Sequence, residues 1–178
     1  MTQLILTVDS DFVDLALDEI KRAHAKVVAT LAPGVLFTEC NQSFSELAEA
    51  WRAAPPIFIR HLCPVDTIIP LVAQLDADLA ALRQAVVEEI VPLADRALFF
   101  SVQTRILADV PYKPFDVNNA LSTVFQTATG APLNVRTPQQ ILSVVIAPTL
   151  EHDAFQGVRW APHSAFLGLS LTMHNLSD

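Results

Sequence analysis

The sequence predicts an α+β fold made of two successive domains, and three observations lead to this prediction. Short apolar runs of strand length alternate with segments in which apolar residues recur at helical spacing. Apolar residues make up 52% of the 178 residues, which is enough apolar surface to offset the entropy lost on ordering. The segment Cys63-Pro64-Val65-Asp66 indicates a boundary between residues 1–65 and residues 66–178.

The first domain is expected to contain strand, helix, strand, strand, helix and strand in that order. Its four strands are expected at 4–8, 26–31, 35–38 and 57–62, and its two helices at 12–23 and 43–51. Polar residues at 9–11, and Ser43 or Ser45, offer side-chain oxygens that can cap the helix starts. This order is the ferredoxin-like arrangement, in which two helices cover one face of an antiparallel sheet.

The second domain is expected to begin with a long helix over residues 70–93, because apolar residues recur there every three or four positions. A coiled-coil seam is the alternative, but about three heptads fit, so we favour packing within the domain. We expect the acidic pairs Asp76/Asp78 and Glu88-Glu89 to solvate this helix. The remaining expected elements are a one-sided strand at 98–106, a helix ending at Gly130, a buried strand at 141–147 and an alternating strand at 166–173.

The charge balance is acidic, with 11 Lys and Arg against 19 Asp and Glu and a formal net charge of −8. Such a balance argues against a protein that binds nucleic acid by phosphate neutralisation over its whole surface. Residues 96–150 have the opposite charge balance, because they contain four basic residues and only two acidic ones, Asp109 and Asp116. A local basic surface is therefore expected in the second domain.

No apolar run approaches the roughly 20 residues that span a bilayer, and the start lacks the positive region of a signal peptide. Cys40 and Cys63 form no CxxC pair and sit in apolar contexts. We therefore expect buried free thiols, a cytoplasmic location and no membrane partner. No GxGxxG, Walker A, GxSxG or HExxH pattern occurs, and the histidines lack metal-ligand spacing, so no catalytic, cofactor or metal site is expected in this chain.

Four stretches of the second half carry a family resemblance. They are Phe99–Arg105, Pro114–Leu121, Gly130–Pro138 and Ile141–Ile146. Together they resemble a THUMP domain, in which a strand with a basic residue precedes a short helix, a glycine-containing turn and a further apolar strand. The resemblance implies an RNA-binding region of an RNA-modifying enzyme, with a ferredoxin-like domain before it.

The end of the chain narrows the resemblance. Phe166–Ser170 and His174–Asp178 resemble the segment that leads into the catalytic domain of bacterial SAM-dependent methyltransferases related to the large-subunit rRNA 2′-O-ribose enzymes. This implies that the chain docks structured RNA, most simply rRNA, for a C-terminal methyltransferase domain that binds SAM. The family's catalytic residues and SAM-binding glycine loop find no matching positions here.

RNA contacts are expected from basic side chains of the second domain. The candidates are Arg105, Lys113, Arg136, Arg96 and Arg159, with Tyr112 as a stacking surface. Solvated surface positions are the alternative interpretation of each. A different class of function also fits the high apolar share and low charge: a protein-interaction or architectural module that buries apolar surface against a partner domain or a second copy.

Overall fold

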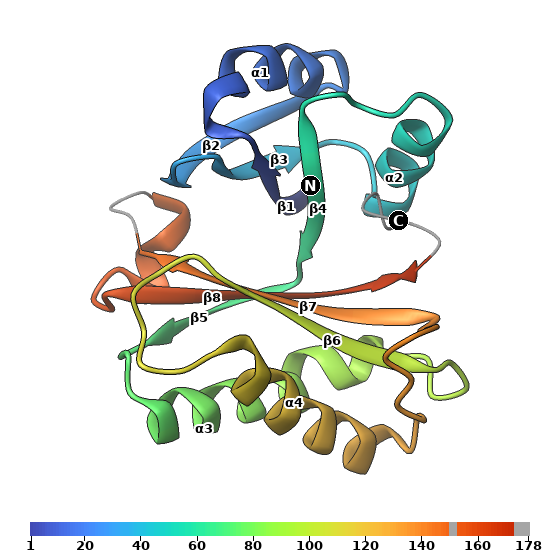
Figure 1. The fold of residues 1–178 in the computed structure, drawn as a ribbon, viewed down its shortest axis with the longest axis vertical. Coiled ribbons are helices and arrows are strands. Elements are labelled where there is room, and N and C mark those ends of the chain that lie inside the picture. Colours follow the sequence, from blue (N-terminus) through green and yellow to red (C-terminus); the bar gives the residue numbers. More distant parts are fainter. Residues whose placement is uncertain (150–152, 173–178) are drawn as a thin grey trace. The chain divides into compact units, whose positions relative to one another are not determined.

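The computed structural model of the chain describes residues 1–149 and 153–172. These residues divide into two compact units, Met1–Val65 and Asp66–Thr172. Each unit contains one four-stranded sheet (Figure 1). The α+β fold class expected from the sequence is confirmed. No helix in the described ranges is long and apolar enough to cross a membrane.

The first unit has the expected ferredoxin-like order of elements. They are β1 (Thr2–Val8), η1 (Ser10–Phe12), α1 (Val13–Arg22), β2 (Ala25–Ala32), β3 (Val35–Cys40), α2 (Phe44–Ala53) and β4 (Ile59–Val65). The sheet order is β2-β3-β1-β4, and every neighbouring pair is antiparallel. Leu4, Leu6 and Val8 alternate along β1 and pack in one core with residues of α1 and α2, so both helices cover the same face.

Local chemistry explains where these elements start and turn. Ser43 caps α2, because its hydroxyl accepts the Glu46 N–H and the Glu46 carboxylate accepts the Ser43 N–H, which is a capping box. Gly34 turns the chain between β2 and β3 with φ +75°. A Cβ at this position would lie 2.3 Å from the carbonyl oxygen of Val8, so glycine is required there. Cys40 and Cys63 are buried and free, as expected.

The second unit contains two helices on one face of a mixed sheet (Figure 1). Its elements are β5 (Thr67–Leu71), α3 (Leu75–Ala85), η2 (Val86–Ile90), η3 (Val91–Leu93), β6 (Phe100–Ile106), α4 (Pro114–Thr129), β7 (Gln140–Pro148), η4 (Asp153–Val158) and β8 (His163–Leu171). The sheet order is β5-β8-β7-β6; β6 and β7 run parallel, and the other pairs are antiparallel. Leu82, Val86 and Ile90 are fully buried in this unit's core, which confirms packing within the domain.

Two strand assignments were wrong, and proline is the reason in both. β4 continues through Pro64 to Val65, where the sequence predicted a strand over 57–62, and residues 67–71 form β5, where it predicted the start of a helix. Proline lacks an N–H and is tolerated in edge strands, and β4 and β5 are both edges of their sheets. The helix therefore begins at Leu75, and Val72 lies before it and is 46% exposed.

The strands β6 and β8 are also buried more evenly than their patterns indicate. Ser101 of β6, expected on a wet face, is 3% exposed. In β8, five consecutive residues from Ser164 to Gly168 are buried instead of every second one. β8 pairs on both sides, and the ring of Phe155 in η4 packs edge-on against Phe166 with 5.9 Å between ring centroids. The expected continuation of the strand to residue 173 lies outside the described residues.

Asp78 does not solvate the long helix, and Tyr112 offers no stacking surface; both expectations are wrong. Asp78 is 1% exposed and Tyr112 is 6% exposed. The Asp78 carboxylate accepts the Tyr112 hydroxyl at 2.6 Å and the Val72 N–H at 2.8 Å, so it ties the start of α3 to the connection between β6 and α4. Burial, aided by the adjacent Asp78 carboxylate, raises the pKa of Tyr112 well above its usual range.

Tyr112→Phe should lower the free energy of unfolding by about 1–2 kcal/mol at neutral pH, because one Asp78 oxygen then loses its donor. The raised pKa means that the native state holds the phenol neutral while the unfolded state ionises near pH 10. The wild-type free energy of unfolding should therefore fall more steeply above about pH 10 than that of the variant.

Chemical denaturation across this pH range measures the difference. Tyr112 is the single tyrosine, so tyrosinate absorbance reports it directly and should appear only on unfolding. Asp76→Ala, at an exposed neighbouring position, is the control and should change the free energy by less than about 0.5 kcal/mol. Equal pH dependence in wild type and Tyr112→Phe would contradict the assignment.

Candidate nucleic-acid interface

The five candidate cations lie at two opposite ends of the second unit's sheet. β6 and β7 run parallel, so the loops that precede them meet at one end and the segments that follow them meet at the other. Arg96 and Arg136 precede β6 and β7, respectively. Arg105 is near the end of β6, Lys113 immediately precedes α4, and Arg159 precedes β8, whose first residue pairs with the last residue of β7. A strand of this length spans about 20 Å, so the structure brings these residues together as two groups.

Gln140 organises the end that carries Arg96 and Arg136. Its side chain is 1% exposed and lies at the first position of β7. The amide nitrogen donates to the carbonyl oxygens of Asp95 at 2.5 Å and Leu98 at 3.1 Å, and the amide oxygen accepts the Asp95 N–H at 3.2 Å. One buried side chain therefore holds the loop that contains Arg96. Nothing in the sequence pattern singled it out.

Further hydrogen bonds lock this loop to the one that carries Arg136. Phe99 N–H donates to the side-chain oxygen of Gln139 at 3.0 Å, and Asn134 N–H donates to Phe100 O at 2.9 Å. The Asn134 side-chain oxygen accepts the N–H groups of Arg136 and Thr137, at 3.1 and 3.0 Å, which closes an Asx turn. We call residues 94–99 and 132–139 the loop pair. Its two cations are exposed, and so are three apolar side chains, Phe99, Leu133 and Val135.

The opposite end of the sheet is arranged around the start of α4. Arg105 is half-buried on β6, beside Thr104, whose hydroxyl donates to the Asn118 side-chain oxygen of α4 at 2.7 Å. Lys113 is the exposed N-cap residue of α4, and its N–H donates to the Asp116 carboxylate at 2.9 Å. The local excess of positive charge at this end is therefore small, because Asp116 lies within the same helical turn.

Two exposed aromatic side chains adjoin these cations, and sequence reasoning missed both. Phe115 is 74% exposed in the first turn of α4, close to Lys113, and Trp160 is 68% exposed next to Arg159. Exposed aromatic rings are the surfaces on which unpaired bases stack. The helical phase of α4 could have found Phe115, since it lies off the buried stripe that includes Val117 and Leu121.

Exposed cations and exposed apolar or aromatic side chains thus lie at both ends of the second unit's sheet. The fold of the chain matches solved structures over nearly its whole length. TrmN from Thermus thermophilus matches 99% of this chain with a TM-score of 0.68 at 23% identity, and the chain spans 47% of that protein. A predicted N6-adenine-specific DNA methylase from Listeria monocytogenes matches 93% of the chain with a TM-score of 0.57 at 10% identity, and the chain spans 39% of it.

A protein from Pyrococcus horikoshii matches 96% of the chain with a TM-score of 0.53 at 11% identity, and the chain spans 55% of it. At these identities the likeness shows the fold. Both four-stranded sheets lie within the matched part of the chain, which confirms the α+β fold expected from the sequence. No protein-family model and no curated protein matches the chain.

Gln140→Ala should release the loop pair. The Asp95 N–H and two carbonyl oxygens would lose their partner, and we expect the free energy of unfolding to fall by about 2 kcal/mol. Amide hydrogen exchange at Asp95 should accelerate more than the global loss of stability explains. Gln126→Ala, at an exposed position of α4, is the matched control. Unchanged protection of the Asp95 amide in Gln140→Ala would show that the clamp does not hold the loop.

Proposed function

We propose that this chain is the RNA-docking region of a SAM-dependent RNA methyltransferase. It holds structured RNA so that a methyltransferase domain outside this sequence meets its target nucleotide. The observation that carries the proposal is the match of 99% of the chain to less than half of TrmN, with a TM-score of 0.68. The Listeria protein is named a predicted DNA methylase, which supports methyl transfer as the activity of the parent enzyme.

The surface chemistry supports RNA as the ligand. Both ends of the sheet combine exposed cations, which contact phosphates, with exposed apolar or aromatic side chains, which contact sugars and bases. The net charge of −8 limits the long-range attraction of the chain for a polyanion. We therefore expect affinity from a few local contacts and a shallow dependence on salt.

The RNA target, the cellular location and the cofactor expected from the sequence are part of the same proposal. Ribosomal RNA is the target that the resemblance of the chain's end implies, and the cytoplasm is the location. SAM would bind to the catalytic domain and supply the methyl group there. The glycines of this chain are not clustered: Gly34 lies in a hairpin and Gly130 at a helix end. No glycine-rich loop suited to SAM therefore occurs within its sequence. The residues present do not fit SAM.

Removing the candidate cations should flatten the salt dependence of RNA binding by roughly one unit of slope per contact. The double variants Arg96→Gln/Arg136→Gln and Arg105→Gln/Lys113→Gln test the two ends separately. Binding is measured by fluorescence anisotropy over a series of salt concentrations, with an rRNA fragment and a tRNA. A preference for the rRNA fragment would support the rRNA assignment, and a preference for the tRNA would overturn it.

Arg83→Gln is the charge-matched control, because Arg83 is exposed on α3, on the helix-covered side of the unit. Its slope should stay close to that of the wild type. Slopes that are unchanged in both double variants would overturn the site assignment. Light scattering distinguishes the protein-interaction alternative: self-association without RNA affinity would favour it over RNA docking.

A further inference from the structure

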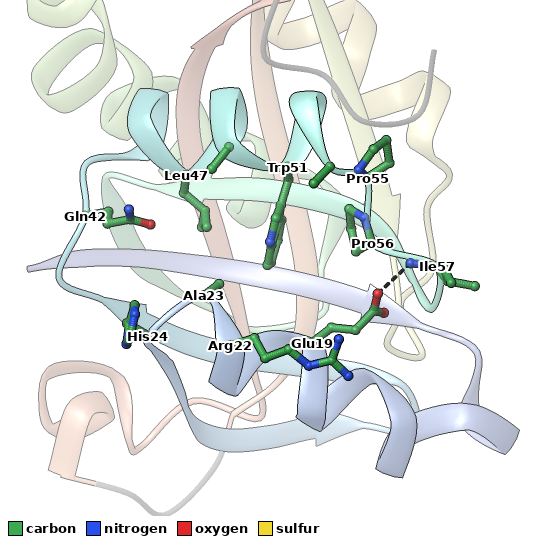
Figure 2. Close-up of a pocket in the computed structure, with 12 residues that line it drawn as sticks. Glu19, Arg22, Ala23, His24, Gln42, Leu47, Trp51, Pro55, Pro56 and Ile57 are labelled. Atoms are coloured by element: carbon green, nitrogen blue, oxygen red, sulfur yellow. Dashed lines mark hydrogen bonds between the residues drawn. The ribbon is translucent and has the colours of Figure 1, made fainter.

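A hollow of about 440 Å³ lies between α1 and α2 in the first unit. Figure 2 shows Trp51 reaching from α2 toward α1, with Gln42 and His24 to one side and Pro55, Pro56 and Ile57 to the other. This volume falls within the range of pockets that bind small ligands. The RNA contacts proposed above all lie in the second unit, so the hollow is a separate feature.

The floor of the hollow, its innermost wall, is apolar, and hydrogen bonds hold the chain segment at its outer edge. Trp51 is 7% exposed and Leu47 is fully buried, so the floor belongs to the core of the unit. The Glu19 carboxylate accepts the N–H groups of Ile57 at 2.6 Å and Phe58 at 2.7 Å, one on each oxygen. These bonds anchor the chain after Pro55-Pro56 to α1 (Figure 2). The hollow is therefore formed in advance of any ligand, and both oxygens of the Glu19 carboxylate already accept hydrogen bonds.

Three polar side chains at the hollow have no partner. Among the described residues, Arg22, His24 and Gln42 make no side-chain hydrogen bond or ion pair. They come from the end of α1, the turn after it and the loop before α2. Arg22 and His24 can carry positive charge, and Gln42 can donate and accept hydrogen bonds at once. The free polar groups around the apolar floor thus suit a ligand with a negative charge and a polar edge.

We propose that this hollow binds one unpaired nucleotide of the docked RNA. The base lies on the apolar floor beside Trp51, its polar edge bonds to the Gln42 amide, and its phosphate pairs with Arg22. A purely apolar ligand would make no use of these three polar groups, of which Arg22 and His24 are exposed and Gln42 is half-buried, and a simple anion would make no use of the floor. A nucleotide is the ligand class that satisfies both. This inference rests on the proposed function, because it names RNA as the source of the nucleotide.

The test uses the two tryptophans of the chain. Trp160→Phe leaves Trp51 as the sole indole, and its fluorescence should be quenched in a saturable manner by a short single-stranded RNA. In this background, Gln42→Ala and Arg22→Gln should each weaken the binding of that RNA about fivefold, which is the loss of about one hydrogen bond. Asn41→Ala and Lys21→Gln are the matched controls, since both residues are exposed neighbours that do not line the hollow.

The outcomes separate this inference from the proposed function. Absence of quenching, or an equal loss of affinity in Arg22→Gln and Lys21→Gln, overturns the nucleotide site, while salt-dependent binding of structured RNA would still support docking. Quenching by uridine or adenosine monophosphate, without binding of structured RNA, overturns docking and the RNA source of the ligand. Larger losses in the two lining variants than in their controls support the site.

Discussion

β6 and β7 run parallel, with Phe100 opposite Gln140 and Ile106 opposite Ile146, and α4 makes the connection between them. A parallel pair needs such a crossover, which returns the chain to the end of the sheet where β6 began. The loops before both strands therefore meet, and the segments after them lie about 20 Å away. This single pairing decides that Arg96 accompanies Arg136, and that neither accompanies Arg105.

Buried or half-buried polar side chains hold the connections that this topology creates. Asp78 binds the N–H of Val72 and the hydroxyl of Tyr112, and Gln140 binds the loop that carries Arg96. Glu19 does the same in the first unit for Ile57 and the residue after it. In each case a side chain satisfies backbone groups that lie outside regular structure, where they would otherwise have no partner. Order in the loops thus depends on a few hydrogen bonds whose loss is costly.

An acidic chain that docks RNA needs its contacts to be local. Arg96 directly follows Asp95, and Lys113 shares a helical turn with Asp116, so little net positive field extends from these positions. In the proposed function, stacking on Phe115 and Trp160 would supply binding energy that does not depend on charge. The proposed nucleotide site in the first unit would add a contact with unpaired RNA without adding a basic patch. The proposed docking function is in this way compatible with the charge of the chain.

The sequence alone determined the type and order of most elements, because apolar spacing and capping residues such as Ser43 are local signals. It placed Cys40, Leu82 and Val144 inside and indicated the basic stretch of residues 96–150. Only the tertiary structure decided that Pro64 and Pro70 lie in edge strands, since an edge exists only once a sheet has assembled. It alone decided that Asp78 meets Tyr112 across 34 residues and that Gln140 meets Asp95 across 45, because such partners are set by topology and not by spacing along the chain.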